Sequence, residues 1–332
     1  MNGRLENQKK TEDRIGRILK DQPEILTTYY ISIGDKTHNT KLKYLNAVTR
    51  FVSYLNNNNL YIDNQPWWEN IKPIHINSYM DFIKTAPDGT ERSESYRCMQ
   101  YHAVSSFFNF LLDNDYIEKN PCDKVKLPRV KKEVGVVYLT LDEINQLESN
   151  IISGIGSDRA KSRQEKWKER DLALVHLVLC TGLRVSALTE INISDVDLNN
   201  AVIRVTEKEN FTRDVYLDKH TVQLLKKWIA KRKELLDDKE SDALFISRER
   251  TRISTKATNE MIKKYTQTIG KHITTHKLRS TFAMNVYEAT GDIYVTSNLL
   301  GHNSVETTKI YTTVTEQKKR AVADVLSNLY KK

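Results

Sequence analysis

The chain has 332 residues, of which 39% are hydrophobic and 8% aromatic, so it can form two domains with buried cores and is neither a small stapled peptide nor a wholly disordered chain. Its three cysteines are too few and too scattered for a disulfide framework or a four-ligand zinc site, which favours a reducing, cytoplasmic location. The net charge of +9 suits a polyanionic partner but does not establish one.

Neither a membrane span nor a signal peptide is expected. The longest apolar run, Leu172 to Cys180, is about half the length that a bilayer requires. Near the N-terminus, Arg4, Lys9 and Lys10 are not followed by an apolar block.

The first predicted domain, residues 1–126, is all-helical. Its apolar residues recur with helical spacing in two stretches and show no strand-like alternation. These residues are Tyr44, Val48, Phe51, Val52 and Leu55, then Val104, Phe107, Phe108, Leu111 and Leu112. Trp67 and Trp68 are interpreted as packing groups, and the asparagines 56–59 as a helix stop followed by a loop.

A linker is predicted at residues 127–136. All six prolines lie at or before Pro128, and the stretch from Lys119 to Gly135 is polar, basic and interrupted by two of them.

The second predicted domain, residues 137–332, begins with a helix signature, Thr140 with Glu143 three residues later. The run Leu172 to Cys180 predicts a buried helix, which Gly182 is placed to end. Inside that helix, His176 is interpreted as a satisfied core histidine. His220 has no predicted role.

A change of period then predicts a β-hairpin, VIRV (202–205) and DVYL (214–217), which flank a polar tip. The pair Asn199-Asn200 suggests a further turn and a three-stranded sheet. Everything from Thr221 onward is predicted to be helical. The fold class is therefore mainly α with one small antiparallel sheet.

Charge gathers in this second part. Residues 1–130 carry a net charge of +2 and residues 131–332 carry +7.

Several familiar site motifs are missing from the sequence: the phosphate loop, H-E-x-x-H, G-x-S-x-G and paired C-x-x-C. Their absence disfavours nucleotide hydrolysis and zinc chemistry.

Five fragments remain, and their order carries the signal. They are TGLRVSAL (181–188), TEKEN (206–210), THKLRSTFA (275–283), LLGH (299–302) and TTKIYTTV (307–314). Together they resemble the tyrosine recombinase (phage integrase) family from residue 137 to residue 320. The helical first domain and its linker look like the SAM-like core-binding domain of that family.

The resemblance implies a catalytic set of Arg184, Lys208, His276, Arg279, His302 and Tyr311. Tyr311 would form a 3′-phosphotyrosyl bond and release a 5′-hydroxyl without metal or other cofactor. Arg184 and Arg279 would stabilise the charge of the pentavalent transition state. His276 would act on the tyrosine side of the reaction, His302 would donate a further hydrogen bond, and Lys208 would protonate the leaving 5′-oxygen.

Two departures from the family pattern stand out. Lys208 is flanked by Glu207 and Glu209, whereas family hairpins often carry glycine near this lysine. Arg213 is therefore a secondary candidate for the residue that protonates the leaving 5′-oxygen. Ala187 stands where the family often has an acidic residue, and Glu190 is the expected substitute. Three other tyrosines are rival nucleophiles with less matching contexts, namely Tyr287, Tyr294 and Tyr330.

The implied partner is double-stranded DNA, bound by a tetramer. A C-terminal helix (321–329) either packs into a neighbouring protomer of that tetramer or packs on its own domain. Accessory DNA-bending or directionality factors are further candidate partners. The primary interpretation is integration or excision of a mobile element, favoured by the N-terminal extension (1–21) and the divergent motif flanks. Alternatives are an Xer-type dimer resolvase, a type IB topoisomerase-like enzyme and an inactive DNA-binding regulator.

Overall fold

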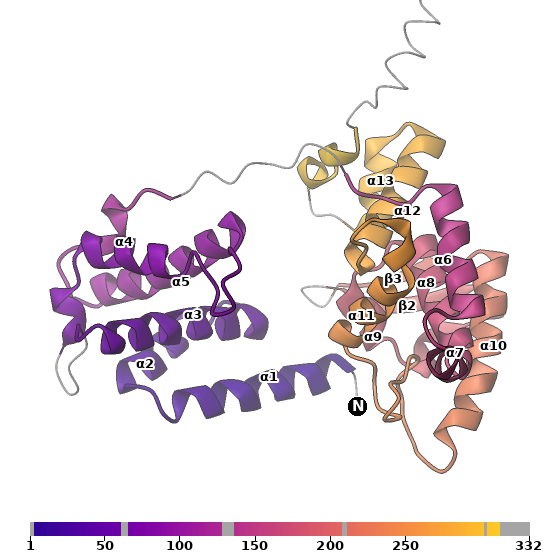
Figure 1. Ribbon diagram of the computed structural model, residues 1–332, viewed down its shortest axis with the longest axis horizontal. Coiled ribbons are helices and arrows are strands. Elements are labelled where there is room, and N and C mark those ends of the chain that lie inside the picture. Colours follow the sequence, from indigo (N-terminus) through magenta and orange to yellow (C-terminus); the bar gives the residue numbers. More distant parts are fainter. Residues whose placement is uncertain (1–2, 61–65, 128–135, 208–210, 302–303, 313–332) are drawn as a thin grey trace, which may run out of the picture. The chain divides into compact units, whose positions relative to one another are not determined.

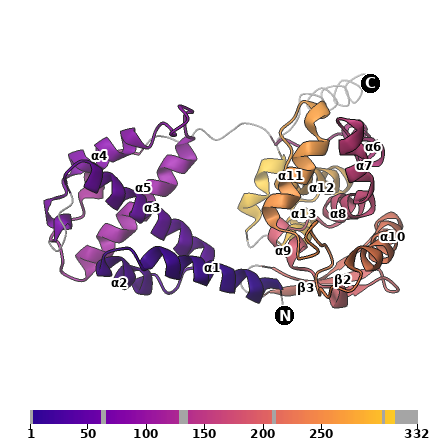
Figure 2. The same ribbon diagram turned by 60° about the horizontal axis from the view of Figure 1, so that its bottom comes forward.

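The computed structural model describes residues 3–60, 66–127, 136–207, 211–301 and 304–312. The chain divides into two compact units (Figure 1). The first, Leu5–Glu133, is called the helical unit; the second, Val134–Lys332 with Met1–Arg4, is called the mixed unit. Figure 2 shows that the described part of the helical unit is built of helices and that the strands belong to the mixed unit.

The α-helices of the helical unit are α1 (Gly3–Leu19), α2 (Glu24–Ser32), α3 (His38–Asn57), α4 (Pro73–Phe82) and α5 (Glu94–Asp113). Its core is aromatic: Tyr29 meets Phe107 edge to face, with ring centroids 5.3 Å apart, and Phe51 packs on Tyr79 at 5.0 Å. Such contacts stabilise a core beyond the area that they bury. The predicted helices at α3 and α5 are confirmed, and Trp67 is buried as expected.

Helix α3 begins and ends where the sequence indicates. Thr37 accepts a hydrogen bond from the Thr40 amide, which satisfies a free donor at the helix start. The helix ends at Asn57, and Asn59 adopts a φ of 57°, a left-handed conformation that asparagine tolerates. The predicted stop in the asparagine run is confirmed.

The first part of the polar stretch from Lys119 to Gly135 belongs to the helical unit and precedes the predicted linker at 127–136. Pro121–Lys124 form a 3-10 helix, η2, in which Cys122 is fully buried. The Tyr101 hydroxyl donates to the Cys122 carbonyl at 2.8 Å. An apolar thiol in the core holds this short segment in place despite its polar neighbours. Residues 128–135 lie outside the described part.

The mixed unit is built around α8. Its α-helices are α6 (Leu141–Ser153), α7 (Asp158–Glu165), α8 (Lys168–Thr181), α9 (Val185–Glu190), α10 (Lys219–Leu236), α11 (Thr255–Tyr265), α12 (Thr275–Thr290) and α13 (Ile293–Leu300). Helix α8 packs against α6, α10 and α12. From Leu172 onward its sequence is apolar nearly all round, as expected of a helix that is covered on several sides.

Local signals in the sequence position these helices. Thr140 and Glu143 form the predicted capping box at the start of α6: the Glu143 amide donates to Thr140 Oγ1, and the Thr140 amide donates to the Glu143 carboxylate. Gly182 ends α8 in a left-handed conformation with φ of 62°. Both predictions are confirmed.

The sheet has the order β1-β2-β3, all antiparallel, with β1 (Val196–Asp197), β2 (Val202–Thr206) and β3 (Thr212–Tyr216). Ile203 lies opposite Val215, and both face the core with Val205. This confirms the predicted three-stranded sheet and places Glu207 directly after β2.

The expectation of continuous helix from Thr221 onward is wrong between α10 and α11. There the chain is extended: Ala243 forms a β-bridge with Asn192, and Ile246 with Arg252. The short apolar run Leu244 to Ile246 is fully buried, and its backbone bonds to the segment after α9, as in the 2.9 Å bond from the Leu244 amide to the Ile191 carbonyl. Backbone groups of a buried segment need such partners whether or not the segment is helical.

At the end of the described chain, Ser304 caps a short 3-10 helix, η6 (Val305–Thr307), rather than an α-helix. A second 3-10 helix, η7 (Lys309–Thr312), follows. The predicted C-terminal helix at 321–329 falls outside the described residues. Within the described ranges, none of the helices combines the length and hydrophobicity needed to cross a bilayer.

Candidate active site

Arg184 is positioned by the turn that joins α8 to α9. Gly182 ends α8, and Arg184 takes the N-cap position of α9 with an extended backbone. Its side chain is 37% exposed. A guanidinium group at a helix N-terminus, beside free backbone amides, is a natural place for an anion to bind.

Arg279 lies on α12 and is 2% exposed. Its Nη1 donates to the Gly182 carbonyl at 2.6 Å, and its Nη2 donates to the Leu300 carbonyl at 2.6 Å. Arg184 uses the next carbonyl, because its Nη2 donates to the Gly301 oxygen at 3.1 Å. Both arginines are therefore held by neighbouring carbonyls at the end of α13, and Arg279 is also held by the end of α8.

One carboxylate joins Arg184 to Arg213. Glu207 is 7% exposed, contacts Arg184 directly through Oε2, and accepts from Nε and Nη2 of Arg213 at 3.1 and 2.8 Å through Oε1. We call Arg184, Arg213, Arg279 and Glu207 the arginine cluster. Glu190 stays the support for Arg184 that the sequence predicts; the structure adds the carboxylate of Glu207 beside Arg184.

The sequence held a signal for this role. Two arginines aimed at one phosphate repel each other, so the loss of an acidic residue at Ala187 calls for a carboxylate elsewhere. Glu207 was interpreted only as an unusual neighbour of Lys208. Its contact with Arg184 spans 23 residues and depends on how β2 lies against α9, which composition and periodicity do not reveal.

The cluster remains electropositive. Burial, and then the neighbouring Arg184, lower the pKa of Arg279 to about 10, while Glu207 and Tyr311 act in the opposite direction. Arg279 is still charged near neutral pH, so three guanidinium groups face one carboxylate and a net charge of +2 remains. A bound anion such as a phosphodiester would stabilise this arrangement.

His276 lies one helical turn before Arg279, in the first turn of α12. Desolvation lowers its pKa below the usual value, and the charges of Lys277, Arg279 and Arg184 lower it further. The imidazole is therefore mostly neutral near pH 7, the form that can accept a proton.

Tyr311, in η7, is 3% exposed and packs with Phe282 and Leu300 in a small core of its own. Its hydroxyl is 3.5 Å from Ser280 Oγ, at the long limit of a hydrogen bond, and Ser280 is next to Arg279 in the chain. Ser280 was not predicted from the sequence.

Four of the six predicted catalytic residues are thus described, and Arg184, His276, Arg279 and Tyr311 lie close enough that their charges act on one another. Lys208 and His302 lie outside the described residues. Arg213, the secondary candidate, belongs to the cluster. In the described part of the chain, the group that could hold a metal ion is elsewhere in the mixed unit: Glu148, His176 and His220.

The chain is similar in sequence to a known protein family and to several of its members. The phage integrase family matches residues 138–318. A tyrosine recombinase XerC from Vibrio vulnificus is 34% identical over 213 residues, which cover 63% of this chain and 63% of that protein, just under two thirds of its length. A XerC from Leptospira interrogans is 28% identical over 254 residues, 76% of this chain and 77% of that protein.

Two solved structures share the fold. The XerH site-specific recombinase bound to its difH substrate, in a pre-cleavage complex, has a TM-score of 0.64 at 20% identity, covering 86% of this chain and 80% of that chain. The Tn1549 transposon integrase in complex with transposon right-end DNA has a TM-score of 0.66 at 20% identity, covering 92% and 98%. The predicted recombinase fold is confirmed. Since the family match covers more than half of the sequence, the chain belongs to the phage integrase family.

Proposed function

We propose that this protein is a site-specific tyrosine recombinase, which cleaves and rejoins double-stranded DNA through a 3′-phosphotyrosyl intermediate on Tyr311. The observation that carries the proposal is the arginine cluster with Tyr311 beside it. Arg184 and Arg279 donate to the neighbouring carbonyls of Gly301 and Leu300 at the end of α13, and the Tyr311 hydroxyl lies 3.5 Å from Oγ of Ser280, the residue next to Arg279.

The chemistry follows from these groups. Tyr311 Oη attacks the phosphorus, the new O–P bond replaces the bond to the 5′-oxygen, and that oxygen leaves as a hydroxyl. Arg184 and Arg279 stabilise the charge that accumulates on the non-bridging oxygens. The bond energy is conserved in the phosphotyrosine, so strand rejoining needs no external energy source.

Two protons must move. Neutral His276 accepts the proton of the tyrosine hydroxyl, a role that its lowered pKa supports. We assign the proton for the leaving 5′-oxygen to Lys208, and a hydrogen bond to the transition state to His302. Tyr311 is buried in this structure, so its side chain must turn toward the bound phosphate for cleavage.

The test is covalent trapping on DNA that carries a nick near the cleavage point, so that the cleaved product diffuses away. The wild-type protein is expected to form an adduct that survives SDS, and Tyr311→Phe is expected to form none. Tyr294→Phe is the matched control, since Tyr294 lies in the same unit and its side chain is 71% exposed. An adduct formed by Tyr311→Phe would refute the assignment of the nucleophile.

The same experiment, with an assay for supercoil relaxation beside it, separates the other classes of protein. A topoisomerase-like enzyme would form the adduct and relax supercoils without pairing two sites. An inactive regulator would bind DNA specifically and form no adduct even as wild type. The intact set of Arg184, Arg279 and Tyr311 favours an active enzyme.

We further propose that residues 1–126 form the core DNA-binding domain and residues 137–332 the catalytic domain. Four copies would assemble on two DNA sites. The C-terminal segment would help this assembly, as would accessory factors where the mobile element needs them. The mass of the complex on DNA with two sites, measured by light scattering, tests this. Four chains per two duplexes are expected, and two chains per two duplexes would refute it.

For the biological role, we propose integration or excision of a mobile element, since the glutamates beside Lys208 depart from the usual family hairpin. Dimer resolution is the second candidate, favoured by the 34% identity to XerC. Footprinting distinguishes the two roles when DNA that flanks the gene is compared with chromosomal sites elsewhere. Protection only at the flanks supports a mobile-element recombinase. Protection only at the other sites supports a dimer resolvase.

A further inference from the structure

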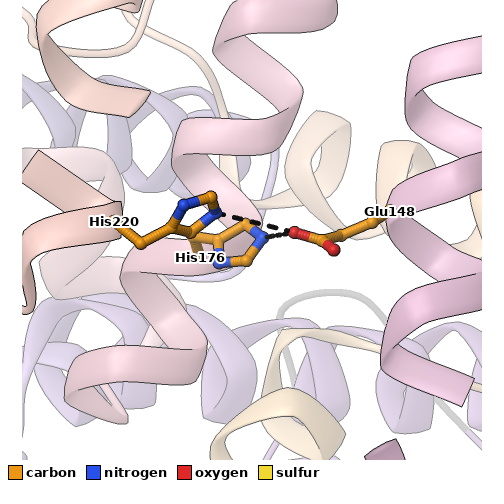
Figure 3. Close-up of side chains that lie close together, drawn as sticks. All are labelled: Glu148, His176 and His220. Carbon is orange, nitrogen blue, oxygen red and sulfur yellow. Dashed lines mark hydrogen bonds and ion pairs between the residues drawn. The ribbon is translucent and has the colours of Figure 1, made fainter. Parts of the chain in front are cut away.

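Three side chains with metal-ligating atoms meet outside the arginine cluster (Figure 3). Glu148 comes from α6, His176 from α8 and His220 from the first turn of α10. Their ligand atoms all lie within 4.8 Å of one another. His176 Nε2 contacts Glu148 Oε1 directly, and His220 Nε2 is 3.7 Å from the same oxygen.

The framework that holds these side chains is rigid. On α8, the residues on either side of His176, Val175 and Leu177, are fully buried. The His176 side chain is 15% exposed and faces the two helices, α6 and α10, that pack against α8. Ligands that come from packed helices keep their relative positions, which favours a preformed site.

The geometry suits one ion among three ligands. The two imidazole rings lie 4.7 Å apart at an angle of 73°, and both Nε2 atoms face one carboxylate oxygen (Figure 3). An ion with bonds of about 2.0–2.2 Å to nitrogen and oxygen separates tetrahedral ligand atoms by about 3.3 Å. The three ligand atoms lie within 4.8 Å of one another, so small rotations of the side chains would bring them to the separation that one ion requires.

The ligand types select the ion. Two histidines and one glutamate are a known zinc set, whereas Mg²⁺ and Ca²⁺ prefer oxygen ligands alone. The His220 side chain is 57% exposed and that of Glu148 is 27% exposed, so solvent reaches the ligands and a water can complete the coordination.

We propose that Glu148, His176 and His220 form a binding site for a divalent transition-metal ion, best matched by Zn²⁺, which cross-links α6, α8 and α10. The ion would take no part in strand cleavage. Helix α8 ends at Gly182, so the ion would stabilise the helix whose C-cap carbonyl accepts the hydrogen bond from Arg279.

Zinc titration of the tag-free, full-length protein after removal of metals by a chelator tests the site. One equivalent of Zn²⁺ is expected to bind by calorimetry. At a free concentration about a hundredfold above Kd, it should raise the melting temperature of the mixed unit by about 5 to 10 °C. Mg²⁺ at the same concentration should give no shift.

The decisive variant is His220→Ala, because the exposed His220 side chain can be removed without opening the core. It should weaken Zn²⁺ binding at least about 100-fold, since even residues that only support a ligand cost 10- to 100-fold. Glu148→Gln should do the same. His272→Ala, which changes another exposed histidine, should bind like the wild type. Wild-type protein that binds no zinc, or His220→Ala that binds it with unchanged Kd, would overturn the proposal.

Discussion

At the scale of single residues, the buried carboxylate of Glu207 determines how the arginines are presented. Its two oxygens are divided between Arg184 and Arg213, and its side chain is 5% exposed. A buried charge of this kind is stable only while it keeps partners of opposite charge. In the proposed mechanism Glu207 is therefore a positioning residue, which would act on the phosphate through the guanidinium groups.

Glu207→Gln tests this role. The amide keeps the shape of the side chain but not its charge, so Arg184 and Arg213 repel each other and the guanidinium fork of Arg184 turns away from the phosphate. Single-turnover cleavage of nicked DNA should slow about 10- to 100-fold, because small misplacements of catalytic groups cost that much. DNA affinity, measured by anisotropy, should change by less than about threefold, since the backbone contacts remain.

Glu234→Gln is the matched control and should cleave at nearly the wild-type rate, because its side chain is 66% exposed and pairs with Lys231 on α10. A purely structural role for Glu207 would lower the melting temperature and the DNA affinity together with the rate. A Glu207→Gln variant that cleaves at the wild-type rate would contradict the assignment.

Residues of the site were predictable to different degrees. The sequence predicts Arg184, His276, Arg279 and Tyr311 as site residues because their order and flanks resemble a family, and the structure places these four near one another. The trio around His176 was not found, because its members stand on three helices and a histidine inside an apolar run is usually a packed side chain. Only the packing of α6 and α10 on α8 brings the three ligands together.

At the scale of elements, the turn between α8 and α9 joins the core to the arginine cluster. Gly182 adopts a φ of 62°, and a Cβ added there would lie 2.3 Å from the Phe282 ring. Its carbonyl accepts the 2.6 Å bond from Arg279. Any side chain at this position strains the backbone and displaces α12, the helix that carries His276 and Arg279.

Gly182→Ala should therefore lower the free energy of unfolding by about 2 to 4 kcal/mol, from about 1 kcal/mol or more of left-handed strain plus the overpacking against Phe282. Gly291→Ala is the matched control: Gly291 also ends a helix at positive φ, 68°, but an added Cβ meets nothing within 4 Å. It should cost only about 1 kcal/mol. Urea unfolding curves measure both, and equal losses would show that the contact with Phe282 is unimportant.

Most elements could be predicted because the forces that form them are local. Each signal lies within a few residues of the element that it determines. Examples are the capping box at Thr140, the left-handed Gly182 and the alternation in β2 and β3. The extended segment around Leu244 was missed because its backbone partners lie near Ile191, far away in the chain. A short apolar run does not by itself distinguish strand from helix.

At the scale of the whole molecule, the tyrosine and the arginines of one active site could come from the same chain or from two different chains. Tyr311 is packed against α12 of its own mixed unit, beside Ser280 and in the same small core as Phe282. Reaching the arginines of another chain would require η7 to leave this core. We therefore expect each active site to be assembled in cis, from one chain, even within a tetramer.

Mixing two inactive variants tests this expectation. Tyr311→Phe lacks the proposed nucleophile, and Arg184→Gln lacks a charge that the proposed transition state needs. The Arg184 side chain is partly exposed, so the fold should tolerate its replacement. In a cis arrangement, every site in a mixed assembly lacks one group, and no covalent adduct should form on nicked DNA. A trans arrangement would pair intact tyrosines with intact arginines and restore adduct on a substantial share of sites. Wild type mixed with Tyr311→Phe is the control, because adduct must still form there if the mixed assemblies are competent.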